Sequence, residues 1–215
     1  MRSYLPKAAA VAALLSVGLT GCAHEGDITA TGILANYTAC PPVAIAAPTG
    51  DVTFFNPANS RDADAIDLVA QITNVRGTCN DSGEFIVTEV SFDVQARRRD
   101  AAGPREVTLP YYATVIQGST NIVAKRVSRI GLHFDDGQLR TSTSGTATTH
   151  VLRSAATLPE DIRDQITRER RAGDPNAAVD PMADPAVRAA VERARFEVLI
   201  GFELTEDQLR YNATR

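Results

Sequence analysis

The sequence has 215 residues, a length suited to one domain with short appendages. Its net charge of −4 argues against nucleic acid as a partner and against broad adhesion to anionic lipid. It contains no tryptophan, which excludes a tryptophan platform for stacking sugars.

The first 21 residues have the pattern of a secretory signal. Arg2 and Lys7 precede an apolar run that is too short to span a bilayer, which takes about 20 residues. The run ends in Leu19-Thr20-Gly21-Cys22, which resembles the lipobox of bacterial lipoproteins. In that pattern the chain is cut before the cysteine, so we expect residues 1–21 to be removed and Cys22 to carry palmitate or a similar acyl chain. The alternatives are an ordinary cleaved signal and a retained transmembrane anchor.

Lipidation at Cys22 would attach the mature chain to a membrane of the bacterial envelope. Lipoproteins of this kind carry several acyl chains, and two or more hold a protein firmly on a bilayer. Ala23 occupies the position where an Asp would suggest inner-membrane retention, so we expect the outer membrane, with the chain facing the periplasm. Residues 1–21 include Arg2 and Lys7 and no acidic residue, so the mature chain has a net charge of −6.

The other two cysteines are expected to form a disulfide. Once Cys22 carries lipid, Cys40 and Cys79 remain as an even pair in an oxidising compartment. The bond would stabilise the fold by about 4 kcal/mol in the chain-entropy description. The alternative is two free buried thiols. A metal pair is disfavoured because neither cysteine has a Cys or His at ligand spacing.

Residues 22–39 form the expected tether, and residues 40–215 form the expected folded domain. Seven stretches of the domain alternate apolar and polar residues or are short and apolar, the patterns of strands. The expected strands are residues 52–55, 66–72, 86–96, 107–115, 122–134, 138–152 and 196–204. Asp136-Gly137 is the strongest hairpin signal, because glycine accepts the positive φ that such turns need. Pro110 predicts that its strand is an edge strand or contains a bulge.

Helical periodicity replaces the alternation at about residues 157–194. Thr157–Glu160 predicts a capping box at the start of a surface helix, and Asp184-Pro185 predicts the start of another helix. Thr205–Gln208 predicts a second capping box before a short C-terminal helix.

These elements predict a mainly β protein, an immunoglobulin-like antiparallel β-sandwich with two or three short helices near the C-terminus. A partly open barrel is the alternative. The strand at 196–204 has the cleanest alternation, and a lone strand has no partners for its backbone, so we expect it to pair with earlier strands. The helices are then an insertion before a closing strand.

Several motifs resemble those of a family of proteobacterial envelope lipoproteins. They are Val107–Tyr112, Ala124-Lys125, Gly201–Thr205, Gln208-Leu209 and Tyr211-Asn212. The resemblance covers nearly the whole mature chain and implies the envelope compartment and the sandwich fold. It brings no activity with it.

No catalytic motif accompanies these signals. The sequence lacks a Gly-x-Ser-x-Gly elbow, Cys-x-x-Cys, His-Glu-x-x-His and a phosphate-binding glycine loop, so we expect no enzyme activity and no cofactor. Asp135-Asp136 is interpreted as a hairpin tip, because calcium needs about six to eight oxygen ligands. His133 is expected to face solvent or a sheet edge.

Arg97, Arg98 and Arg99 form a candidate surface for an acidic partner; the alternative is a solvated end of a strand. We therefore consider two functions of different classes. The first is a non-enzymatic envelope module that docks another envelope protein or steadies an assembly. The second is an envelope enzyme, such as a hydrolase, whose site assembles only in three dimensions.

Overall fold

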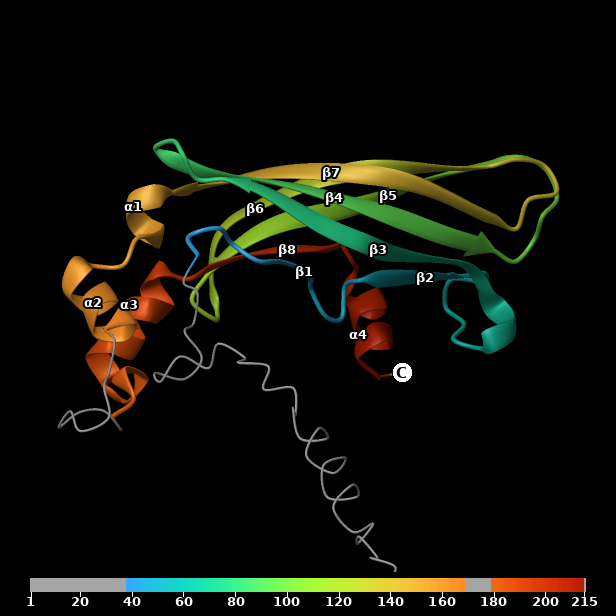
Figure 1. Ribbon diagram of the computed structural model, residues 1–215. Coiled ribbons are helices and arrows are strands. Elements are labelled where there is room, and N and C mark those ends of the chain that lie inside the picture. Colours follow the sequence, from blue (N-terminus) through green and yellow to red (C-terminus); the bar gives the residue numbers. More distant parts are fainter. Residues whose placement is uncertain (1–37, 169–178, 215) are drawn as a thin grey trace, which may run out of the picture. The chain divides into compact units, whose positions relative to one another are not determined.

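The computed structural model describes residues 38–168 and 179–214. These residues form two four-stranded sheets and several short helices, most of them near the C-terminus (Figure 1). Sheet A has the strand order β1-β8-β5-β6, and sheet B has the order β2-β3-β4-β7. The strands are β1 (Val43–Ile45), β2 (Asp51–Phe55), β3 (Ile66–Asn80), β4 (Phe85–Arg98), β5 (Arg105–Gln117), β6 (Asn121–Phe134), β7 (Arg140–Leu152) and β8 (Phe196–Phe202).

The mainly β, sandwich-like fold is thus confirmed, with one parallel pair, β1 with β8, among antiparallel neighbours. The α-helices are α1 (Arg153–Ala156), α2 (Glu160–Thr167), α3 (Pro185–Ala194) and α4 (Glu206–Thr214). Single 3-10 turns lie at η1 (Ala63–Ala65) and η2 (Pro181–Ala183). The expected signal, Cys22 and residues 23–37 of the tether lie outside the described residues.

The core lies between the inner faces of the two sheets. Alternate residues of β4 and β8 are buried, as their alternating sequences predict. The largest fully buried side chains come from both sheets: Leu68, Ile72, Ile86, Phe92, Leu109, Leu132, Phe134, Ile200 and Phe202.

The last strand pairs with strands that precede it by many residues, as expected. β8 lies inside sheet A, antiparallel to β5 with Tyr111 opposite Phe202 and parallel to β1 with Val43 opposite Val198. α3, which leads into it, begins at the predicted position, since the Asp184 carboxylate accepts a hydrogen bond from the Ala186 N–H at 2.8 Å.

The prediction that Pro110 marks an edge strand or a bulge is wrong. β5 is an interior strand, and its register shift lies between Val115 and Ile116. The Pro110 carbonyl accepts from the Glu203 N–H at 3.0 Å, so the backbone of Pro110 faces the β8 side of the sheet just beyond Phe202, the last residue of β8. The missing N–H therefore removes no bond to β6.

Two local predictions also differ from the structure. β3 continues to Asn80, past a bulge at which Asn74 has φ of 52°. The capping box at Thr157–Glu160 does not form: Pro159 precedes α2, and the Thr157 hydroxyl donates to the Arg153 carbonyl at 2.7 Å. The second box does form, because Thr205 and Gln208 exchange side-chain-to-N–H bonds of 3.0 and 3.3 Å.

Candidate functional site

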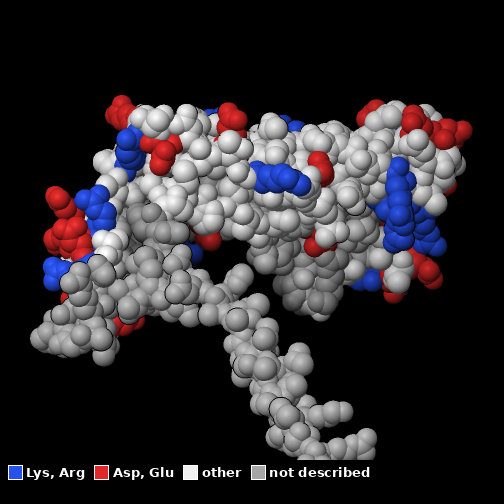
Figure 2. Space-filling view, viewed as in Figure 1, with Lys and Arg blue, Asp and Glu red and all other residues white. Residues whose placement is uncertain are grey.

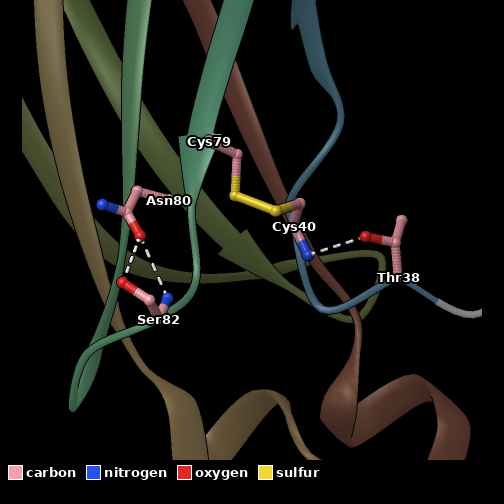
Figure 3. The surroundings of a disulfide bond; sticks show 5 residues. All are labelled: Thr38, Cys40, Cys79, Asn80 and Ser82. Carbon is pink, nitrogen blue, oxygen red and sulfur yellow. Dashed lines mark hydrogen bonds between the residues drawn. A yellow bond between two sulfur atoms is a disulfide. The ribbon is translucent and has the colours of Figure 1, made fainter.

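The predicted disulfide joins the start of the described chain to the end of β3. Cys40 and Cys79 are bonded, with 5.9 Å between their Cα atoms (Figure 3). The Thr38 hydroxyl accepts from the Cys40 N–H at 3.2 Å, and the turn after Cys79 is held by Ser82, which donates twice to the Asn80 side chain. The covalent bond thus fixes the position at which the chain enters the domain.

Arg98 does not belong to a partner surface, contrary to the expectation for the three consecutive arginines. Its side chain is 3% exposed and points inward from the end of β4, over the Phe134 ring. The guanidinium donates to four main-chain carbonyls, those of Gln138 (2.7 Å), Gly103 (2.8 Å), Ala101 (2.8 Å) and Asp135 (2.9 Å). Arg98 therefore holds the β4–β5 and β6–β7 loops together.

Arg97 and Arg99 are exposed, as a partner surface requires. Arg97 lies directly opposite Arg140 of β7, and both line a shallow hollow of about 540 Å³ on the outer face of sheet B. Like charges in this position repel each other. Within the described residues, the side chains of Arg97, Arg99 and Arg140 make no hydrogen bond or ion pair with one another or with an acid. They remain a candidate surface for an anionic group.

His133 faces the outer side of sheet A and is half exposed, as expected. Its Nδ1 contacts the Glu106 carboxylate, and its Nε2 lies 3.1 Å from Asp135 Oδ1. The hydrogen bond to Glu106, followed by that to Asp135, raises the pKa of His133 above its ordinary value. This cluster is an exposed ion pair at the end of a strand. No group of three or more His, Cys, Asp or Glu suited to a metal ion occurs in residues 38–168 and 179–214.

The sandwich is open along one side, between β6 and β7. A loop joins these strands at one end, and they diverge toward the end where α1 lies (Figure 1). β6 is consequently buried only in its second half, at Ile130, Leu132 and Phe134, whereas residues 121–127 are all exposed. Each strand is also the edge of its sheet. We call this region the open edge, meaning residues 121–129 of β6 and 146–150 of β7.

A cleft of about 440 Å³ lies between the two strands of the open edge. Its floor is formed by Tyr111, Ala113 and Val115 of β5, which belong to the core. Ala124, Arg126 and Ser128 line one side, and residues 146–150 line the other. The Tyr111 hydroxyl donates to the Thr146 carbonyl at 2.9 Å, so the floor contacts the free margin of β7.

The charge of the open edge differs from that of the rest of the chain. β6 contains Lys125, Arg126 and Arg129, and neither β6 nor β7 contains an aspartate or a glutamate. On the face shown in Figure 2, by contrast, charged side chains of both signs gather at the two ends and the middle is mostly uncharged. Ile122 (60% exposed), Val123 and Val127 (51% exposed) add apolar surface to this basic strand. Lysine and arginine on an edge strand commonly keep it from pairing with another basic strand, so the charge of β6 restricts which chains this margin can bind.

The sequence motifs did not identify the open edge. The sequence contained one indication of it. The segment 121–129 is long enough to be a strand, but Ala124 is its only apolar residue that faces the core. An arginine at an inward position, Arg126, predicts that the neighbouring sheet does not cover the strand there.

Comparison with protein-family models, curated proteins and solved structures found no match. No helix within the described ranges is long and apolar enough to cross a membrane. The open edge is therefore interpreted from its own geometry.

Proposed function

We propose that this chain is a lipid-anchored protein of the bacterial cell envelope that docks another envelope protein along its open edge. Cys22 attaches it to the membrane, most naturally the outer membrane with the domain in the periplasm. The domain acts as a binding module without an enzymatic activity of its own.

The open edge is the observation that carries this proposal. In sheet A, β8 and β5 have a strand on each side, whereas β6 has no described strand on its outer side and is much longer than β1, the strand at the other edge. Natural proteins usually protect such a margin, because its free N–H and C=O groups pair readily with another chain. Exposed Ile122, Val123 and Val127 offer apolar contact at the same place. The disulfide supports an oxidising compartment.

Substituting Cys22→Ser tests the anchor. Cells labelled with a clickable palmitate should incorporate label into the parent protein and not into the variant, which should accumulate as a precursor or a soluble product. Label retained by the variant would overturn the lipid assignment.

Photo-crosslinking at a single position tests the docking surface. A benzophenone amino acid at Val127 of the full-length protein in native membranes should yield adducts of discrete mass. The control places the same residue at Glu89, an exposed site on the outer face of sheet B, and should yield none. Equal adducts at both positions, or none at Val127, would contradict docking at the open edge.

A further inference from the structure

We propose that the open edge takes an extended, acidic polypeptide segment, which adds to sheet A as a strand beside β6. This inference deepens the proposed docking function and names the chemistry of the partner. It rests on the direction of the backbone groups of β6, on the cleft and on the charge of the two strands.

The backbone of β6 presents free groups at known residues. In antiparallel strands the N–H and C=O of one residue point to the same neighbour, and this direction alternates along the strand. Pro110 faces β8, so Tyr111 and Ala113 face β6, where they pair with Ser128 and Arg126. The Thr114 hydroxyl reaches the Ala124 carbonyl at 2.8 Å, consistent with this alternation.

The residues between these positions point their backbone groups away from β5. They are Lys125, Val127 and Arg129, and no described strand lies on that side. A segment in extended conformation can pair with them at the usual inter-strand spacing of about 4.8 Å.

Side chains of the added strand would alternate between the cleft and the outer face. On the inner side they would lie over Ala113 and Val115 and beside Arg126. On the outer side they would lie beside Lys125, Val127 and Arg129. Apolar and acidic side chains therefore suit both faces. Lys125 already pairs with Glu203 at 2.7 Å and lies over the Tyr112 ring of β5, so its ammonium is turned toward the interior of sheet A. Arg126 and Arg129 form no ion pair with a described residue, and they are the cations that an acidic segment would meet at the margin.

The same charges disfavour a second copy of this chain as the occupant. Antiparallel pairing of two β6 strands centred on Val127 would place Lys125 opposite Arg129 twice. Like charges directly opposite each other destabilise a strand pair. An acidic segment turns the same contacts into attraction, and it is favoured for that reason.

Synthetic octapeptides provide the probe. Fluorescein-labelled (Asp-Val)4, (Lys-Val)4 and (Asp-Pro)4 are titrated with the full-length protein in detergent, and binding is followed by fluorescence anisotropy. We expect (Asp-Val)4 to bind at least about ten-fold more tightly than either control, with an affinity that falls as salt is added. (Asp-Pro)4 has the same charge but lacks every second N–H, so equal binding of the two acidic peptides would refute strand addition.

Two variants test the site itself. Val127→Pro removes an N–H that points away from β5, so it blocks an added strand without breaking a bond inside the sheet. Its matched control, Val127→Thr, keeps the N–H and the β-branched shape. We expect Val127→Pro to weaken (Asp-Val)4 binding about ten-fold or more and Val127→Thr to leave it nearly unchanged. Equal affinities for the two variants would refute the site.

Charge reversal covers the case in which Val127→Pro fails to fold. The double variant Arg126→Glu, Arg129→Glu should prefer (Lys-Val)4 over (Asp-Val)4, and an unchanged preference would overturn the inference. The experiments distinguish failure of this inference from failure of the docking function. Discrete crosslinks from Val127 without selective binding of (Asp-Val)4 would support docking at the open edge and refute an acidic strand as the partner. If neither crosslinks from Val127 nor selective peptide binding were observed, the docking function would be refuted as well.

Discussion

Phe202 tests whether the last strand completes the core. Its side chain is 1% exposed and lies in β8, between β1 and β5, far along the chain from most of its neighbours. An aromatic side chain buries about 150–250 Å², which at about 25 cal/mol per Å² corresponds to roughly 4–6 kcal/mol. Measured Phe→Ala substitutions in cores cost about 3–5 kcal/mol, so we expect Phe202→Ala to remove this much from the free energy of unfolding. That is a large share of the stability of a typical domain.

Thermal and urea unfolding of the unlipidated protein measure the loss. One kcal/mol shifts the Tm of a domain of this size by about 2–4 °C, so Phe202→Ala should lower the Tm by roughly 6–20 °C. Phe85→Ala is the matched control, since Phe85 is 43% exposed, and it should cost within about 1 kcal/mol. Equal losses for the two variants would refute the reasoning. So would a protein truncated before Arg195 that melts cooperatively at the Tm of the whole domain.

Three further predictions follow from the geometry of individual side chains. Arg98→Met removes the guanidinium from four carbonyls, of which those of Ala101 and Asp135 keep the backbone N–H groups of Gly137 and Gln138 as donors. It should lower the free energy of unfolding in urea by at least about 2 kcal/mol, with Arg98→Lys losing less. Reduction of Cys40–Cys79, which are 39 residues apart, should lower it by up to about 4 kcal/mol, and non-reducing peptide mapping should recover the linked peptides. The pKa of His133 is raised in the folded protein, so the stabilisation by its charged form is complete below the unfolded pKa and disappears as pH rises through the folded pKa. An NMR titration should show that Glu106→Gln lowers the pKa of His133, and an unchanged pKa would contradict the contact.

The alternation of apolar and polar residues predicted most strands of the two sheets, because each strand has one face on a common core. β4 and β8 are the clearest cases: every second residue is buried in the structure, and all of these except Thr88 and Arg98 are apolar in the sequence. The same alternation identified β8 as a member of a sheet, since an isolated strand has no hydrogen-bond partners for its backbone N–H and C=O groups. It did not identify β1, because a three-residue strand is too short to show a period.

The departures arise where contacts distant in sequence override a local rule. The bulge at Asn74 shifts the buried face of β3 by one residue, so the second half of that strand loses its period in the sequence. Pro110 is tolerated in an interior strand because β8 has already ended beside it. Neither the end of β8 nor the bulge can be located from the residues that adjoin them.

The candidate site was predicted only in part. Three consecutive arginines are equivalent in the sequence, but the alternation of β4 turns Arg98 inward while Arg97 and Arg99 stay outside. The open edge depends on the angle at which two sheets diverge, which no short motif records. The disulfide was predictable because it required only a count of cysteines and an oxidising compartment.

The disulfide also determines where mechanical load enters the domain. Tension on the chain before Cys40 would otherwise act on β1, a strand of three residues whose few hydrogen bonds to β8 could be peeled away one after another. The bond to Cys79 transmits that tension directly to β3, a strand of 15 residues that pairs with β4 from Leu68 to Asn80 and with β2 from Ile66 to Gln71. Rupture would then have to break the longer ladder between β3 and β4 as well. A domain held to a membrane through its N-terminus would thus resist being pulled open at the point where the pull arrives.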